Sequence, residues 1–187
     1  MGKVLWHTQM SLDGFIAGPD DEMRWVFEVE AGPDETIDEV VASTGALLVG
    51  RRTQDVEDRE QPGFYGGAYR GPFFVLRHDS PPEPPEVKGV TGQFLNAEIG
   101  EAVEIAKRAA EGRDVVVLGA NVARQCLEAD LIDEVLVHVT PILLGDGVRL
   151  FDHPGGNPIK LRRTSVRENG QLTAMRFTVQ RAAGASA

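Results

Sequence analysis

The chain has 187 residues, enough for one domain with a substantial core and few for two. Its formal net charge of −10 argues against a general nucleic-acid or anionic-membrane surface. The single cysteine, Cys126, excludes an internal disulfide, and the four histidines show no metal-ligand spacing, so no metal is expected. With no signal-peptide pattern and no apolar run of membrane-spanning length, a soluble cytoplasmic protein is expected.

Segments with strand character alternate with segments of helical pattern. The predicted strands are, in chain order, Val4–Met10, Ala46–Val49, Phe73–Leu76, Val90–Leu95, Val115–Leu118 and Glu134–Leu143. The clearest helical pattern covers 100–112, where alanines, a valine and an isoleucine recur on one face. Strands that alternate with helices predict βαβ units and a largely parallel sheet.

The C-terminal part of the chain has a different pattern. The Asn-Gly pair at 169–170 lies between two strand-like runs, which predicts an antiparallel hairpin. The proline-rich segment 78–87 is expected to form neither helix nor ladder, and 182–187 is expected to be a disordered tail. This leaves 1–181 as the single folded domain.

Three of the predicted strands end in segments suited to binding an anion. Ala46–Val49 is followed by a glycine, two arginines and a threonine, Phe73–Leu76 by arginine and histidine, and Val115–Leu118 by Gly-Ala-Asn. In an open α/β sheet, ligands bind outside the carboxyl ends of the strands, where helix N-termini offer free N–H groups. All three segments are therefore expected on one rim of the sheet.

The arginine pair at 51–52 has the wrong sign for the first turn of a helix, where the macrodipole favours acidic side chains. A phosphate between the arginines and the helix end would explain it. The alternative is a solvated pair neutralised by Asp55, Glu57 and Asp58, and for the glycine turn at 119–120 the alternative is an ordinary βα turn. Neither a P-loop motif nor a GxGxxG after the first strand is present, which argues against a P-loop NTPase and a Rossmann dehydrogenase.

Taken together, the stretches SLDGFIAGPD (11–20), GRRT (50–53) and the long run from VVVLGANV to GVRLF (115–151) resemble the dihydrofolate reductase superfamily. The closer likeness is to the branch that contains the C-terminal reductase domain of riboflavin biosynthesis enzymes and small free-standing bacterial reductases. It covers nearly the whole chain and rests on the order and spacing of the motifs. The resemblance implies a three-layer α/β fold, with a twisted, mostly parallel sheet, a C-terminal antiparallel hairpin and helices on both faces.

The resemblance also implies that NADPH lies across the carboxyl ends of the strands. Segment 50–53 would hold the pyrophosphate and the 2′-phosphate side, 76–78 would flank the adenosine with Arg77 at the 2′-phosphate, 119–123 would meet the pyrophosphate from the opposite side, and 16–18 would lie beside the nicotinamide ribose. The implied cofactor-binding residues are Ile16, Ala17, Gly18, Gly50, Arg51, Arg52, Thr53, Leu76, Arg77, His78, Gly119, Ala120, Asn121, Val122 and Ala123.

On the substrate side, the resemblance implies that Asp13 lies next to the nicotinamide and takes part in catalysis. The alternative is an Asp-Gly pair that only turns the chain. Trp25 and Thr140 are candidate substrate contacts, with core packing as the alternative for Trp25 and a half-buried sheet position as the alternative for Thr140. Glu22 and Glu28 are candidates by proximity.

Three further features remain open at the level of sequence. His138 lies on the same strand as Thr140 and could line the pocket or be a half-buried sheet residue. The aromatic and glycine-rich segment Gly63–Tyr69 is expected to be a mobile loop over a planar substrate, or else an ordinary surface loop. Cys126 is expected to be a buried, inert thiol.

The predicted activity is that of an NADPH-dependent reductase that transfers hydride to a C=N or C=C bond of a small heterocycle, such as a pterin, a pyrimidine or a flavin precursor. The sequence following the glycine turn, QDVEDREQPG, differs from that of riboflavin-pathway reductases and argues against a sugar-phosphate substrate. The alternative function is a non-catalytic protein that binds NADPH or another nucleotide. No nucleic acid or membrane partner is expected, and the resemblance implies a homodimer.

Overall fold

The computed structural model describes residues 2–30, 32–60, 63–79, 81 and 83–181. The predicted disordered tail, 182–187, lies outside the described residues. No helix in these ranges is long and apolar enough to cross a membrane. The described residues likewise contain no group of three or more His, Cys, Asp or Glu side chains that could hold a metal ion.

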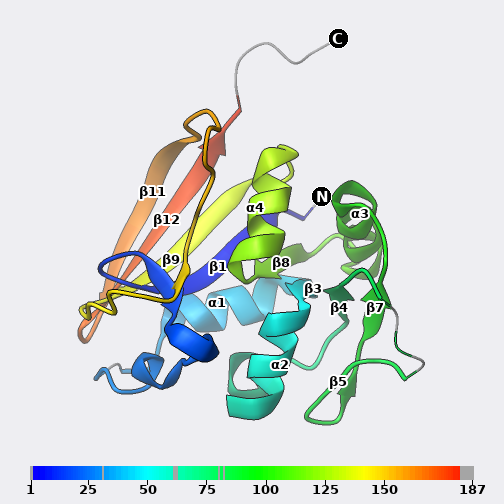
Figure 1. Cartoon of the computed structure of the whole chain (residues 1–187), viewed down its shortest axis with the longest axis horizontal. Coiled ribbons are helices and arrows are strands. Elements are labelled where there is room, and N and C mark those ends of the chain that lie inside the picture. The colour runs from blue at the N-terminus through cyan, green and yellow to red at the C-terminus, as the bar shows by residue number, and fades with distance from the viewer. Residues whose placement is uncertain (1, 31, 61–62, 80, 82, 182–187) are drawn as a thin grey trace.

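Eight strands form one sheet in the order β11-β12-β9-β1-β8-β3-β4-β7 (Figure 1). The strands from β9 to β7 in this order run parallel, whereas β12 pairs antiparallel with both β9 and β11. Both the predicted parallel sheet and the predicted hairpin at 169–170 are therefore confirmed. The strands are β1 (Val4–Ser11), β3 (Thr44–Gly50), β4 (Phe73–Leu76), β7 (Gln93–Leu95), β8 (Asp114–Leu118), β9 (Glu134–Thr140), β11 (Lys160–Asn169) and β12 (Leu172–Gln180).

Two small antiparallel pairs lie outside the main sheet, β2 (Phe15–Ala17) with β10 (Val148–Arg149) and β5 (Glu86–Val87) with β6 (Val90–Thr91). The expectation that 78–87 forms no ladder is wrong at its end, because β5 follows the last proline and keeps its N–H groups. The predicted strand Val90–Leu95 is split into β6 and β7 at Gly92, whose N–H donates to the carbonyl of Pro85. The predicted strand from Glu134 ends at Thr140, because Pro141 follows.

Helices cover both faces of the sheet. They are α1 (Glu35–Ser43), α2 (Arg51–Glu60), α3 (Ile99–Ala109) and α4 (Ala120–Glu128), with 3-10 turns η1 (Pro19–Asp21), η2 (Arg24–Val26) and η3 (Phe64–Gly67). The helix predicted over 100–112 is confirmed as α3. The period of two in a strand sends alternate residues to opposite faces. Val4 and Trp6 pack in the core layer under α3 and α4, whereas Leu5 packs in the layer with Val40 of α1.

Two predicted features of this core can be placed directly. Cys126 is fully buried on the inner face of α4, and burial raises the pKa of its thiol to about 12, as expected of an inert thiol. The segment Gly63–Tyr69 is anchored by buried aromatic side chains at Phe64 and Tyr69, and the Phe64 ring packs edge-on against Phe73. Between these anchors, Tyr65 and Gly66 line the main cleft.

Candidate functional site: a cleft along the carboxyl ends of the strands

The three strand ends predicted to share one rim do so. β3 lies between β8 and β4, with Val49 opposite Leu118 and Gly50 opposite Leu76. A cleft of about 1280 Å³ opens along this rim. Of the predicted cofactor residues, those lining the cleft are Ile16, Ala17, Gly50, Arg51, Arg52, Thr53, Leu76, Arg77, His78, Gly119, Ala120, Asn121 and Val122. Gly18 and Ala123 are not among the lining residues.

Two helices start at this rim, and their N-termini meet through glycines. Gly119 caps α4 with φ +87° and ψ 152°, and a Cβ there would collide with Thr53 Oγ1 in the first turn of α2. A Cβ on Gly50 would lie 3.4 Å from Val122 Cγ2 in the first turn of α4. Two sets of unpaired N–H groups therefore face the same space, as an anion site requires. These residues fit the pyrophosphate of NADPH.

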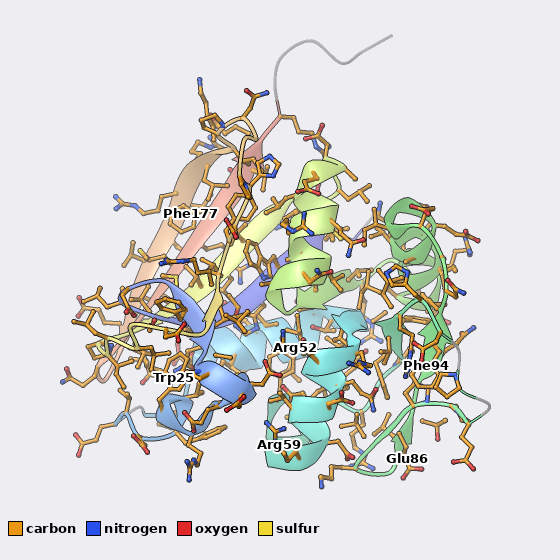
Figure 2. The ribbon with its side chains drawn as sticks, viewed as in Figure 1. Trp25, Arg52, Arg59, Glu86, Phe94 and Phe177 are labelled. Carbon is orange, nitrogen blue, oxygen red and sulfur yellow. The ribbon has the colours of Figure 1, made fainter. Side chains whose placement is uncertain are left out.

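The arginine pair does open a helix, since α2 begins at Arg51 and has no acidic residue in its first turn. Arg52 forms a two-point ion pair with Asp21 of η1, with Nε 3.0 Å from Oδ2 and an Nη atom 2.7 Å from Oδ1. Figure 2 shows Arg52 at the end of α2 nearest the sheet. The partner of Arg52 is thus a distant loop residue rather than the acids of its own helix, and Arg51 stays exposed beside the cleft.

Arg77 at the end of β4 is held by two neighbours. Its guanidinium lies 4.8 Å from the centre of the Phe94 ring, and both Nε and an Nη atom donate to the carboxylate of Asp79, at 2.8 and 2.6 Å. The side chain of Arg77 is 12% exposed, whereas that of Asp79 is 75% exposed. The hydrogen bonds from Arg77, with a smaller contribution from the charge of Arg51, lower the pKa of Asp79. Asp79 therefore occupies the hydrogen-bonding edge of the Arg77 guanidinium, the group expected to face a 2′-phosphate.

We expect Asp79→Asn to strengthen NADP+ binding by about two- to fivefold and to leave NAD+ binding unchanged, because the exposed carboxylate competes with the 2′-phosphate for Arg77. Glu83→Gln removes an equal charge from an exposed site close in sequence and serves as the matched control. Calorimetric titration with both dinucleotides checks this. A parallel gain for NAD+, or the same gain in the control, would contradict the competition.

Asp13 lies away from the lining of the cleft. Its carboxylate accepts hydrogen bonds from Ser11 Oγ at 2.7 Å, from the Leu144 N–H at 3.1 Å and from the Gly145 N–H at 2.7 Å. These bonds, that of Ser11 first, lower the pKa of Asp13 to about 2. An acid with so low a pKa stays ionised at neutral pH and is a poor proton donor. The contacts favour a structural role in which Asp13 ties the first-strand turn to the loop after β9.

A catalytic role for Asp13 stays a prediction, and Asp13→Asn tests it. The amide keeps one acceptor oxygen, so we expect unchanged NADP+ affinity and a loss of turnover below about tenfold. Loss of a general acid–base group would instead lower turnover by about 10²–10⁴. A loss in that range, with the melting temperature of the variant unchanged, would show that Asp13 takes part in catalysis.

The other predicted substrate residues lie behind the cleft wall or outside it. Trp25 is 3% exposed and packs in the interior, and Thr140 is fully buried and accepts a hydrogen bond from Gln9 Nε2 at 2.8 Å. Thr140 therefore reaches the cleft only through Gln9, which lines it. Glu22 bonds the N–H and Nε of Arg24, and Glu28 is exposed; neither lines the cleft.

His138 lines the cleft, as one of its two sequence interpretations expected, but sequence reasoning missed the polar cluster to which it belongs, formed by His7, Asp34, Tyr65 and His138. His7 Nδ1 lies 2.8 Å from the Tyr65 hydroxyl, and the rings of His7 and His138 pack edge-on with centres 5.0 Å apart. His138 Nδ1 lies 3.3 Å from Asp34 Oδ2, while the other oxygen of Asp34 caps α1. The signal that could have revealed the cluster was one histidine within each of two strands rich in apolar residues.

Glu57 on α2 is a further acid that faces the cleft. Its Oε2 atom is buried and has no hydrogen-bond partner among the described residues. Burial raises the pKa of this carboxyl from its ordinary value to about 7. Glu57 therefore exchanges a proton near neutral pH beside Tyr65.

Comparisons with known proteins agree with this geometry. The model of the RibD C-terminal domain family matches residues 2–174. The chain is 27% identical over 176 residues to YwjB, an uncharacterised protein of Bacillus subtilis, covering 94% of this chain and 97% of that one. It is 28% identical over 158 residues to the riboflavin biosynthesis protein RibD of Mycobacterium tuberculosis, covering 81% of this chain but only 46% of RibD.

A solved structure from Shewanella sp. PV-4, of a protein named for riboflavin biosynthesis, superimposes with a TM-score of 0.80 at 23% identity, covering 96% of this chain and 99% of that one. The expected dihydrofolate reductase-like fold is thereby confirmed. Because the family model extends from β1 into β12, it includes every strand end of the cleft described above. The chain belongs to the RibD C-terminal domain family.

Proposed function

We propose that this protein is a cytoplasmic, NADPH-dependent reductase that transfers hydride to a C=N or C=C bond of a small heterocycle. The observation that carries the proposal is the strand-end rim, where two helix N-termini meet and all three cationic side chains of the described cleft lining gather. In a chain of net charge −10, this arrangement favours an anionic ligand. The reductase fold of the family supports the same reading.

Different parts of the cleft would bind different parts of NADPH. Thr53, Gly119 and the N–H groups that follow them would hold the pyrophosphate, and Arg77 with Arg51 would face the 2′-phosphate. Ile16 and Ala17, which line the cleft, would lie beside the nicotinamide ribose. Bound NADPH would supply the hydride. The chain would orient the two reactants, exclude water and supply the proton that follows.

The rival is a protein of the same fold that binds a nucleotide without turnover. Incubation of the purified chain with NADPH and a panel of pterins, pyrimidines and flavin precursors separates the two. The reductase is expected to oxidise NADPH only when an acceptor is present, and the Gly119→Ala variant should lose this activity. Binding of NADPH without oxidation by any member of the panel would favour the rival.

We also propose that the protein is a homodimer. The edge strand β11 and its partner β12 form a long hairpin at one side of the sheet (Figure 1), where Leu161 and Val166 are exposed. Pairing of a second copy would cover that edge. Light scattering should give twice the mass of 20.3 kDa at micromolar concentration. A mass of one chain at high micromolar concentration would contradict the dimer.

A further inference from the structure

Two parts of the cleft lining differ in charge. Among the described lining residues the cations are Arg51, Arg52 and Arg77, and all of them lie at the strand-end rim. A second part of the lining, called here the histidine end, is formed by His7, Gln9, Asp34, Tyr65 and His138 and includes no cation among the described lining residues. Apolar side chains frame it, namely Met23, Val26, Ile37 and Leu172. Acidic side chains line both parts of the cleft, among them Asp21 and Asp79 beside the arginines and Asp34 at the histidine end. Only the strand-end rim therefore offers cations to an anionic ligand.

The histidine end also concentrates hydrogen-bonding atoms that the chain leaves without partners. Among the described residues, seven buried side-chain N or O atoms have no hydrogen-bond partner, and five of them belong to cleft-lining residues, namely His7, Asp34, Glu57 and His138. Buried polar atoms are otherwise almost always paired. Both histidines are more than nine-tenths buried. Asp34 Oδ2 and His138 Nδ1 lie 3.3 Å from each other, so at the histidine end a ligand would supply partners for the ε nitrogens of His7 and His138.

Burial favours the neutral form of both imidazoles. Burial, and then the charges of His138 and Arg176, lower the pKa of His7 well below its ordinary value. Burial also lowers the pKa of His138, although Asp34 opposes this effect. A neutral imidazole offers one N–H donor and one acceptor. The cation that acts on both histidines, Arg176, does not line the cleft and is hydrogen-bonded to Glu134, so a phosphate or carboxylate would meet no cation in the lining here and would face the acids Asp34 and Glu57.

The contacts of the δ nitrogens set the roles of the ε nitrogens. If His138 carries its proton on Nδ1, toward Asp34, then its Nε2 is an acceptor. If the Tyr65 hydroxyl donates to His7 Nδ1, then His7 Nε2 carries a proton and is a donor. The Tyr65 and His7 rings are nearly parallel, with an angle of 11° between planes and centres 5.5 Å apart. One donor and one acceptor side by side match the edge of a lactam.

We propose that the histidine end binds an uncharged, planar heterocycle with a lactam edge and no phosphate or carboxylate, and that His7 and His138 bond its C=O and N–H through their ε nitrogens. This inference rests on the proposed function, since the ligand would be the hydride acceptor. The site differs in this respect from one built for a sugar phosphate.

Binding of matched probes tests the proposal by calorimetry, with and without saturating NADP+. The pairs are pterin against pterin-6-carboxylate and uracil against uridine 5′-monophosphate. At least one uncharged probe is expected to bind, with its charged counterpart weaker by tenfold or more. Tighter or equal binding of the charged counterparts, or no binding of either uncharged probe, would overturn the proposal.

Two substitutions of His138 test whether its Nε2 atom bonds the ligand. The side-chain amide of asparagine can stand in for Nδ1 and that of glutamine for Nε2, so His138→Asn should lose tenfold or more in probe affinity while His138→Gln loses less. Both variants should keep NADP+ affinity and the melting temperature. An unaffected His138→Asn variant would overturn the role of His138. NADP+ is titrated separately from the probes. If NADP+ does not bind, the proposed function is wrong, whereas the result for the probes still tests the histidine end.

Discussion

Replacing Gly119 with alanine is expected to lower the free energy of unfolding by about 1–3 kcal/mol and to weaken NADP+ binding at least tenfold. The backbone of Gly119, at φ +87° and ψ 152°, lies in a region that only glycine adopts readily. In addition, the new methyl group would collide with Thr53 Oγ1 at the meeting point of α2 and α4. Thermal denaturation and calorimetric titration of the variant measure the two effects.

Gly100 provides the matched control, because it lies in α3 and a Cβ there would meet no atom within 4 Å. Alanine is the better helix former, so Gly100→Ala should raise stability by about 0.5–1 kcal/mol and leave NADP+ binding unchanged. Gly119→Ala with wild-type affinity for NADP+ would show that the two helix N-termini do not hold the pyrophosphate.

The second large effect is expected from the double variant Arg51→Gln with Arg77→Gln. Both guanidinium groups line the rim, and charge-assisted hydrogen bonds to phosphate are stronger than neutral ones. NADPH affinity should fall tenfold or more, whereas NADH affinity should change by less than about threefold. As a result, the expected preference of the wild type for NADPH, tenfold or more, should disappear.

Arg108→Gln is the control for net charge, since Arg108 is exposed on α3 and does not line the cleft. The preference of the wild type should also weaken as salt is raised, because exposed charges are screened. Equal affinities of the wild type for NADPH and NADH at moderate salt would contradict the assignment of the arginines.

The rim of the cleft could be predicted because it follows from chain order. Once Ala46–Val49, Phe73–Leu76 and Val115–Leu118 are parallel neighbours, the residues after each must meet at one edge. The hairpin at 169–170 was equally accessible, since Asn-Gly acts locally. The break in the strand at Gly92 was less accessible, because it depends on a hydrogen bond to the Pro85 carbonyl that the sequence does not show. The strand end before Pro141 could have been read from the proline itself.

The histidine end could not be predicted, because its members meet only through register. His7 and His138 come within ring contact because β1 pairs with β9 with His7 opposite Leu136 and Gln9 opposite His138. A shift of one residue in either strand would turn the histidine of that strand to the other face. The hydrogen bonds of Asp13 could not be predicted for a similar reason, since the N–H groups that bond its carboxylate lie about 131 residues farther along the chain. Nothing in the SLDGF stretch shows that its carboxylate is already engaged.

Transfer of deuterium tests the central claim most directly. NADPH with deuterium at both hydrogen positions of nicotinamide C4 is incubated with the protein and the heterocycle that supports the fastest oxidation, and the product is examined by mass spectrometry. For a reductase, one deuterium should appear on carbon of the product for each NADP+ formed. Bound NADPH that is never oxidised, or oxidation that leaves the heterocycle unlabelled, would contradict hydride transfer by this protein.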